Sequence, residues 1–301
     1  MASYQIGIDL GGTKAEAILF DSDGKEKQRK RVPTPKISDA ADNYHAILET
    51  VVSLIEKTAA DIPSKSPYTV GICIPGIIDH QTGLVINANT TCLSGMPFKS
   101  DIEKRLGRRV GMENDANSFT LAESLAGAGA GYHMVLGIIM GTGCGGGICI
   151  DGAVHEGRQG IAGEWGHFSV DPDGRQCFCG NRGCIETKIS GTGVEKTYFE
   201  THGMRLTMRQ IVENYRSGDH DCRKVFEQFI DDFGRCVGGL ISILDPDAIV
   251  LGGGVSNVDE LYALGIARVR QYTFHQELTT PILKNRLGDS AGVYGAAWIG
   301  V

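Results

Sequence analysis

One short stretch of the chain gathers a histidine and three cysteines, the side chains that most often bind zinc. In GEWGHFSVDPDGRQCFCGNRGCIET, residues 163–187, they are His167, Cys177, Cys179 and Cys184. One ring nitrogen and three thiolate sulfurs match a closed tetrahedral zinc site. Buried free thiols and a C-x-C redox pair are the alternatives. A disulfide is disfavoured, because the chain has nine cysteines, an odd count, and disulfides are rare in a reducing compartment. We predict a zinc site, which the glycines of this stretch allow the chain to wrap.

Two glycine-rich turns have the composition of phosphate-binding loops. In IMGTGCGGG, 139–147, three glycines match the dinucleotide fingerprint G-x-G-x-x-G. That fingerprint requires a helix next, whereas GICIDG reads as a strand and a turn. The segment is therefore interpreted as a hairpin turn whose backbone N–H groups can bind an anion, with a plain turn as the alternative. In DLGGTK, 9–14, Asp9 is a candidate for holding Mg²⁺ through water, or simply a polar strand end.

The segment ENDAN, 113–117, contains the candidate general base, Asp115. It lies where a predicted strand meets a predicted helix, and ligand sites of α/β proteins form at the carboxyl ends of strands. Asparagine and aspartate are also the preferred residues at a helix N-cap. A structural cap and a catalytic base are equally compatible with this segment.

These residues need a scaffold, and the hydrophobic pattern predicts one. The predicted strands cover 4–9, 15–20, 25–32, 69–75, 108–115 and 247–254. The predicted helices cover 39–60, 98–106, 116–128, 222–244, 258–275 and 291–299. The strand–turn–strand pattern of 6–24 returns at 134–152. Alternating strands and helices indicate an α/β fold, and the repeat indicates two related halves.

The composition excludes several classes of function. A chain of 301 residues, 42% hydrophobic, can bury a sizeable core, and a net charge of −7 argues against nucleic acid as the main partner. The chain contains no apolar run near the ~20 residues that span a bilayer, and the first residues do not resemble a signal peptide. We therefore expect a cytoplasmic protein without a membrane partner.

Taken together and in this order, these motifs resemble the ROK family of bacterial sugar kinases. DLGGTK is similar to the first phosphate loop of the family, GTGCGGG to the second and DAIVLGGGVSN to the adenosine segment. GEWGH matches the E-x-G-H sugar motif, and CFCGNRGCIET matches the zinc and sugar motif. The resemblance implies the two-lobed hexokinase–actin-like ATPase fold, with ribonuclease H-like halves. It places 1–116 and 290–301 in a small domain and 117–289, with the zinc loop 167–184, in a large one.

The resemblance also implies the roles of individual residues. Asp115 would be the catalytic base, and structural Zn²⁺ would orient the glutamates that face the sugar. The expected sugar-binding residues are Pro75, Gly76, Asn114, Asp115, Glu164, His167 and Glu186. The expected residues for ATP and Mg²⁺ are Asp9, Gly11, Gly12, Thr13, Lys14, Gly141, Thr142, Gly143, Cys144, Gly145, Gly252, Gly253 and Gly254. Partners would be a hexose, MgATP and, in a homodimer, a second copy of the chain.

The expected reaction is phosphorylation of a hexose 6-hydroxyl by MgATP. GEWGH and CIETKISGTG are similar to fructokinases of the mannofructokinase type, which predicts fructose, with mannose as a second substrate. The alternative is an N-acetylglucosamine or glucose kinase, since N-acetylglucosamine kinases share the RVPTP stretch and the IPG loop. An NAD-dependent dehydrogenase is disfavoured by the missing helix. A sugar-sensing repressor is disfavoured because DLGG begins at residue 9, ahead of which the family's repressors carry a helix-turn-helix segment.

Overall fold

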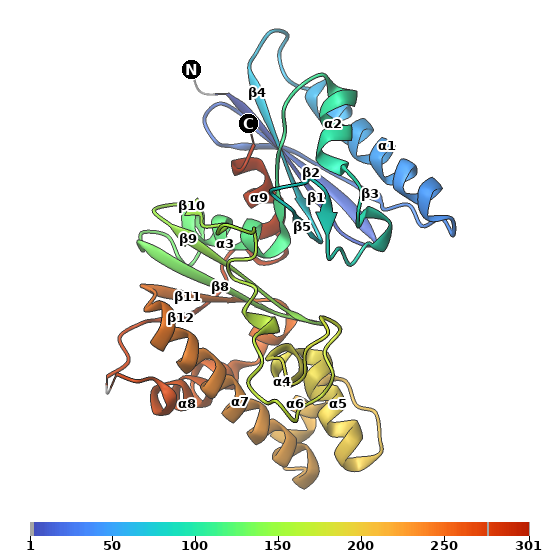
Figure 1. Cartoon of the computed structure of the whole chain (residues 1–301). Helices are drawn as coiled ribbons and strands as arrows, with labels where there is room; N and C mark the ends of the chain where they lie inside the picture. Colours follow the sequence, from blue (N-terminus) through green and yellow to red (C-terminus); the bar gives the residue numbers. More distant parts are fainter. Residues whose placement is uncertain (1–2, 276, 301) are drawn as a thin grey trace. The chain divides into compact units, whose positions relative to one another are not determined.

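The computed structural model describes residues 3–275 and 277–300, and its contacts divide the chain into two compact units (Figure 1). Unit 1 comprises the residues up to 122, 154–162 and those from 287 onwards, and unit 2 comprises 123–153 and 163–286. The predicted division at residues 116 and 290 differs from these units in 117–122, 154–162 and 287–289, which group with unit 1. Each unit is described by itself.

Unit 1 is built on a five-stranded mixed sheet with the strand order β3-β2-β1-β4-β7. β1 pairs with β2 in antiparallel fashion and with β4 in parallel fashion, and β4 and β7 are also parallel. The elements up to the end of this sheet are β1 (Tyr4–Leu10), β2 (Lys14–Phe20), β3 (Glu26–Pro33), α1 (Ala40–Ala59), β4 (Tyr68–Ile74), β5 (Ile77–Ile78), β6 (Val85–Ile86), a 3-10 turn (Thr91–Leu93), α2 (Phe98–Leu106) and β7 (Gly111–Asn114).

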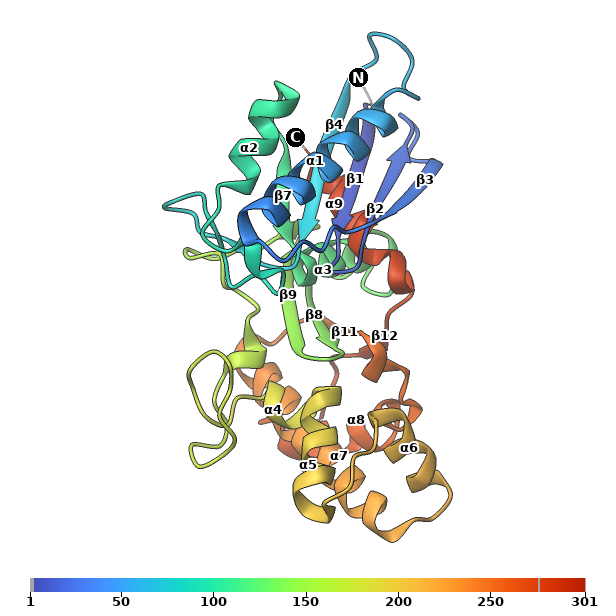
Figure 2. The ribbon, with the colours of Figure 1, turned by 90° about the vertical axis from the view of Figure 1, so that its right-hand side faces the viewer.

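Helices cover both faces of this sheet. On one face α1 runs across the strands, as Figure 2 shows, and buries the apolar stripe that the sequence predicts, including Tyr44, Ile47 and Val51. The Asp39 side chain begins this helix by accepting hydrogen bonds from two N–H groups of the first turn. On the other face α9 (Ala291–Trp298) packs against Phe20 and its neighbours. The carboxyl ends of β1, β4 and β7 therefore stay available for ligands.

The close approach of α9 depends on three glycines in adjacent strands. Gly7 of β1, Gly71 of β4 and Gly111 of β7 lie against backbone atoms of α9 and of the two residues that follow it. A Cβ atom at any of the three would collide with a backbone carbonyl of that segment. Glycine is therefore the residue that lets this helix lie directly on the sheet.

Unit 2 repeats the strand order of unit 1 in its own sheet, β10-β9-β8-β11-β12. β8 and β9 form an antiparallel hairpin, and β8, β11 and β12 run parallel. The mixed α/β fold with two related halves, predicted from the repeated hairpin pattern, is confirmed. The strands are β8 (Met134–Met140), β9 (Cys144–Ile150), β10 (Ala153–Val154), β11 (Ala248–Gly252) and β12 (Ile282–Lys284).

The helices of unit 2 partly differ from the prediction. The predicted helix 222–244 is present, two residues longer, as α7 (His220–Leu244). The predicted helix 258–275 is divided: a 3-10 turn, Asp259–Tyr262, is followed by α8 (Leu264–Tyr272). The Tyr262 hydroxyl donates a hydrogen bond to the carbonyl of Ser256, which lies four residues after the end of β11. Five elements follow from the structure alone: α4 (Glu186–Ile189), α5 (Gly191–His202), α6 (Met208–Arg216) and the 3-10 turns Trp165–His167 and Gly254–Asn257.

The helix α3 (Asp115–Ala126) and the short segment Gly288–Ser290 complete the regular structure. Across residues 3–275 and 277–300, none of the helices combines the length and the apolar character that crossing a membrane requires.

Candidate active site

Asp115 lies at the junction of β7 and α3, as the sequence predicts. The helix-capping role falls to its neighbour: the Asn114 Oδ1 accepts a hydrogen bond from the Asn117 N–H, at 2.6 Å. This is the i to i+3 geometry of an N-cap, so Asp115 is not needed for it. Desolvation raises the pKa of Asp115, opposed by the N–H groups of Ala116 and of Asp115 itself. A carboxylate with a raised pKa is a better proton acceptor near neutral pH.

Asp9, at the end of β1, is the second carboxylate at this edge of the sheet. Burial, the largest cause, raises its pKa to about 6, with the nearby charge of Asp115 adding to it and a hydrogen bond from the Cys73 thiol opposing it. Asp9 pairs with Cys73 across β1 and β4. A Cβ atom on Gly292, in the first turn of α9, would lie 3.1 Å from Asp9 Oδ2. Asp9 is thus enclosed by unit 1, and burial disfavours its negative charge, which a nearby cation would stabilise.

Asp9, Asn114 and Asp115 meet because three neighbouring parallel strands end at the same edge of the sheet. Pro75 and Gly76 follow β4 at this edge. The Pro75 carbonyl accepts a hydrogen bond from the Asn89 N–H at 2.9 Å, which fixes the turn. The predicted residues of unit 1 are therefore brought together.

The first glycine turn, residues 11–14, projects two free N–H groups. The Gly11 N–H donates to the Lys14 carbonyl at 2.9 Å, and this bond closes the turn. In the described part of the chain, the N–H groups of Gly12 and Thr13 donate no hydrogen bond, and both residues are exposed. Lys14 is also exposed, with its ammonium nitrogen 4.0 Å from Glu16 Oε2. The turn can donate to an anion without losing any internal bond.

The second glycine turn has the same construction. The Gly141 N–H donates to the Gly143 carbonyl at 2.9 Å. Within the described residues, the N–H groups of Thr142 and Gly143 donate no hydrogen bond. The Cys144 N–H, by contrast, donates to Glu186 Oε2 at 2.9 Å, so Cys144 has a protein partner where the sequence predicts phosphate. We call residues 141–145 the phosphate loop, after the role that the sequence predicts for them.

A pocket of about 840 Å³ opens beside the phosphate loop, entirely within unit 2. Its size is ample for a nucleoside. Gly141 and Thr142 of the phosphate loop form part of its wall, and Gly254 forms another part. The remaining lining residues come from α5, α6 and the segment after β11: Gly191, Thr192, Glu195, Thr207, Met208, Arg209, Val212, Glu213, Arg216, Val255, Asn257 and Val258.

The three glycines at the end of β11 have different positions. Gly252 is the last residue of the strand and is buried. Gly253 has a φ of 78°, and a Cβ atom there would collide with the Met140 carbonyl. Gly254 reaches the pocket. The predicted adenosine segment thus contributes one pocket wall and one obligatory glycine.

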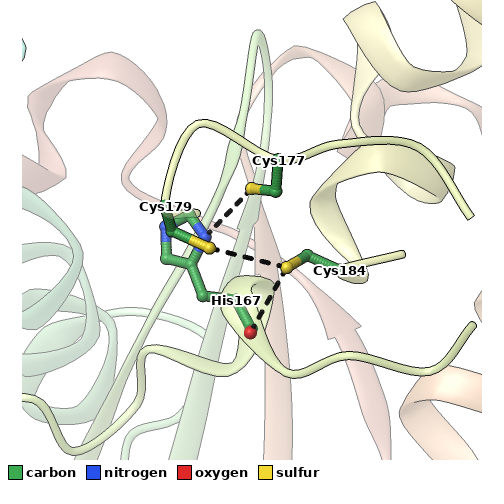
Figure 3. Close-up of side chains that lie close together, drawn as sticks. All are labelled: His167, Cys177, Cys179 and Cys184. Carbon is green, nitrogen blue, oxygen red and sulfur yellow. Dashed lines mark hydrogen bonds between the residues drawn. The ribbon is translucent and has the colours of Figure 1, made fainter. Parts of the chain in front are cut away.

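The four predicted zinc ligands converge (Figure 3). His167 ends the 3-10 turn, and its Nδ1 lies 3.6 Å from Cys177 Sγ, while the Sγ atoms of Cys179 and Cys184 are 3.6 Å apart. All four ligand atoms lie within 4.8 Å of one another. Tetrahedral zinc with Zn–S of about 2.3 Å and Zn–N of about 2.05 Å requires separations of about 3.8 Å between sulfurs and about 3.6 Å between sulfur and nitrogen.

The electrostatics of the cluster also fit a cation. All nine cysteines are free thiols, which argues against the disulfide alternative. Burial, the largest cause, and the other two sulfurs raise the pKa of Cys184 to about 12, and burial also raises the pKa of Cys177. Several adjacent thiolates are stable together only when a bound metal compensates their charge. The residues therefore fit zinc in number, type and spacing.

The remaining predicted sugar residues belong to segments that the cluster ties together. Glu164 precedes the 3-10 turn and Glu186 begins α4, two residues after Cys184. The Ile185 N–H donates to the Phe168 carbonyl at 3.0 Å, and Ser169 bridges to Cys184. The structure thus brings Glu164, His167 and Glu186 into one assembly within unit 2.

Several residues at these sites escaped the sequence reasoning. Glu113 accepts hydrogen bonds from the Asn114 N–H and the Asn117 side chain, and burial raises its pKa. Trp165 donates its indole N–H to the Gly145 carbonyl. The pocket residues Gly191 and Thr192 lie in the CIETKISGTG string but were not predicted as ligands, and those of α6 belong to no recognised motif. The sequence did contain one signal for α6: Thr207 and Gln210 have the spacing of a capping box, and they form one at the start of this helix.

The chain is similar to known proteins over nearly its whole length. The model of the ROK family matches residues 5–300. A curated N-acetyl-D-glucosamine kinase of Pectobacterium atrosepticum is 38% identical over 301 residues, covering 97% of both chains. The N-acetyl-D-glucosamine kinase of Pasteurella multocida is also 38% identical, over 303 residues and 97% of both chains.

Two solved structures agree with the fold. The ROK hexokinase of Thermus thermophilus has a TM-score of 0.87 at 29% identity, covering 99% of this chain and 97% of that one. A ROK glucokinase of Streptomyces griseus, in complex with glucose and AMPPNP, has a TM-score of 0.78 at 30% identity, covering 99% of both chains.

These relatives correct one prediction. Fructose, expected as the substrate, is wrong, because the curated relatives that match nearly the whole chain are N-acetyl-D-glucosamine kinases. The GEWGH and CIET segments supply His167 and Cys184 of the histidine–cysteine cluster as well as three predicted sugar ligands, and their likeness to fructokinases did not identify the sugar. The RVPTP and IPG stretches had pointed to the alternative that the relatives support. Because the family model spans residues 5–300 and the relatives cover nearly the whole chain, the protein belongs to the ROK family.

Proposed function

We propose that this protein is an ATP-dependent N-acetyl-D-glucosamine kinase that phosphorylates the primary hydroxyl at C6. The observation that carries the sugar assignment is the 38% identity, over 97% of both chains, to kinases of that name. The observations that support a kinase are the two glycine turns with free N–H groups and the pocket beside the second turn.

The nucleotide would use the residues of unit 2. Its nucleoside would occupy the pocket lined by α5, α6 and Gly254, and its phosphates would accept hydrogen bonds from Thr142 and Gly143. Gly12 and Thr13 supply the equivalent donors of unit 1. Asp9 would hold the Mg²⁺ that accompanies ATP, through the ion's water ligands, because this carboxylate is enclosed and burial disfavours its negative charge. Mg²⁺ would neutralise phosphate charge during the transfer.

Asp115 would accept the proton of the sugar hydroxyl as that oxygen attacks the γ-phosphorus and the bond from this phosphorus to the β–γ bridging oxygen breaks, with ADP as the leaving group. Three features support this role: its place at the carboxyl end of β7, its raised pKa, and the capping of α3 by Asn114 instead of Asp115. Asn114 keeps its side-chain NH₂ for a sugar oxygen, since its Oδ1 serves the cap. The remaining rate enhancement in such a reaction comes from positioning and charge stabilisation.

Glu164, His167 and Glu186 would bind the hydroxyls of the sugar ring. With Nδ1 directed toward the cysteines, His167 presents Nε2 on the opposite side of its ring. Zinc held by His167, Cys177, Cys179 and Cys184 would be structural, because four protein ligands leave no coordination position for a reactant.

The test is a coupled assay of ADP release with a panel of N-acetylglucosamine, N-acetylmannosamine, glucose, mannose and fructose. We expect N-acetylglucosamine to give the highest kcat/KM, and phosphorus–proton NMR correlation to place the product phosphate on C6. A higher kcat/KM for glucose or N-acetylmannosamine would refute the sugar assignment and leave the kinase assignment intact.

We also propose that the protein is a homodimer, which light scattering after size-exclusion chromatography would test.

A further inference from the structure

Glu186 contacts the phosphate loop directly. Its Oε2 accepts the Cys144 N–H at 2.9 Å. The same oxygen lies so close to Gly143 that a side chain there would collide with it. In the described residues Glu186 Oε1 has no hydrogen-bond partner, so one carboxylate can serve the loop with one oxygen and a ligand with the other.

Trp165 contacts the same loop through the next residue. Its indole N–H donates to the Gly145 carbonyl at 2.9 Å, and the ring is only 5% exposed. The ring fills the space that a side chain on Gly146 would need. Adjacent backbone groups, the N–H of Cys144 and the C=O of Gly145, are therefore both bonded to side chains that lie outside the hairpin.

Both side chains belong to the segments that carry the proposed sugar ligands. Trp165 lies between Glu164 and His167, and Glu186 is itself a proposed sugar ligand. The two segments are joined by the Ile185–Phe168 hydrogen bond and by the bond from the Val170 N–H to the Gly183 carbonyl, at 2.9 Å. A shift of this assembly on sugar binding would therefore move the two bonds that orient the phosphate loop.

We propose that Trp165 and Glu186 are positioning residues that couple sugar binding to nucleotide binding within unit 2. The inference rests on the proposed function. A bound sugar fixes Glu186, and Glu186 and Trp165 fix the orientation of the N–H groups of Thr142 and Gly143. The nucleotide then meets an ordered phosphate loop and loses less entropy on binding. Linkage requires the reverse effect to be equally large.

The test is isothermal titration calorimetry of the intact, zinc-loaded protein with N-acetylglucosamine and with Mg²⁺·AMP-PNP, each alone and in the presence of the other. We expect saturating sugar to tighten nucleotide binding by a factor within about 5–150. Trp165→Phe, which keeps a ring but removes the indole N–H, is expected to bring this factor close to one while the Kd of each ligand alone stays near its wild-type value. Val170→Ala, a change in the same segment at an exposed residue, is the matched control and should keep the coupling.

A coupling factor in Trp165→Phe equal to that of the wild type would overturn the proposal, as would a factor of one in the wild type. A protein that binds neither ligand would instead contradict the proposed function.

A second readout does not depend on the folding of Trp165→Phe. The chain has two tryptophans, Trp165 and Trp298, so Trp298→Phe leaves Trp165 as the sole emitter. We expect Mg²⁺·AMP-PNP alone, and N-acetylglucosamine alone, each to shift its emission, because the nucleotide would contact the phosphate loop to which the indole N–H is bonded, and the sugar would contact Glu164 and His167 in the same segment. An emission spectrum that responds to neither ligand, while calorimetry shows that both bind, would also overturn the coupling.

Discussion

Replacing Asp9 by asparagine is expected to stabilise the ligand-free protein while removing its kinase activity. Burial raises the pKa of this carboxyl from 3.8 to about 6. A carboxyl whose pKa is higher in the folded state binds protons more tightly there, so ionisation opposes folding. Its cost is full above both pKa values, falls as the pH drops through 6, and disappears below 3.8. Asparagine has no such cost at any pH.

The magnitude follows from the shift. A shift of about two units, at about 1.4 kcal/mol each, amounts to about 3 kcal/mol at pH 7. At pH 5 the folded-state carboxyl is mostly protonated, and the same linkage relation leaves about 1.5 kcal/mol. The advantage of Asp9→Asn should therefore be roughly halved between pH 7 and pH 5.

Urea unfolding of the metal- and nucleotide-free protein at pH 7 and pH 5 measures this difference. Asp23→Asn, a change in an exposed turn of the same unit, is the matched control and should show little effect at either pH. Mg²⁺·ADP should stabilise the wild type more than Asp9→Asn, since the carboxylate is where the cation would be held. A variant that is less stable than the wild type at pH 7, or an advantage independent of pH, would refute the reasoning.

Three further predictions address other parts of the site. Asp115→Asn should fold normally and bind sugar, yet lose about 10²–10⁴-fold in kcat, because a positioned base contributes that much; near-normal turnover would show that Asp115 is not the base. Protein purified without added metal should contain one zinc per chain by elemental analysis. Cys177→Ala should lose both the zinc and thermal stability, because a structural zinc contributes to the free energy of folding. A wild-type protein without zinc, with a melting temperature equal to that of Cys177→Ala, would exclude the site. Gly253→Ala should destabilise the protein by about 1–3 kcal/mol, because it places a side chain in the left-handed region and against the Met140 carbonyl. Gly254→Ala is the control and should cost little, because a side chain there meets open space. Equal stability of the two variants in urea would contradict this account.

The sequence predicts well what depends on residue type and short-range spacing. The strands around both glycine turns, the stripe of α1 and the convergence of His167 with Cys177, Cys179 and Cys184 all follow from local patterns. The sequence also predicts the positions of the Asp9 and Asp115 carboxylates, because a polar residue at the end of an apolar strand lies at the carboxyl edge of the sheet.

What the sequence leaves open depends on distant packing. The nucleoside pocket is formed by residues such as Thr192 and Val212, whose types carry no chemical signature and whose meeting depends on how α5 and α6 pack. The bond from Cys144 to Glu186 joins residues 42 positions apart. The prediction of the sugar was wrong for a related reason. Discrimination between hexoses depends on the orientation of a few hydrogen-bonding groups, which short sequence motifs do not encode.

The close packing of α9 against the glycines of the unit 1 sheet has a consequence for folding during synthesis. The chain emerges from the ribosome in sequence order, so unit 2 is finished at residue 286, while unit 1 still lacks the helix that covers Gly7, Gly71 and Gly111. The half that begins the chain is therefore expected to be the last to close, with one face of its sheet uncovered until residues 287–300 arrive. Limited proteolysis of chains ending at residue 286 should cut unit 1 faster than unit 2, and equal resistance of both would contradict this order.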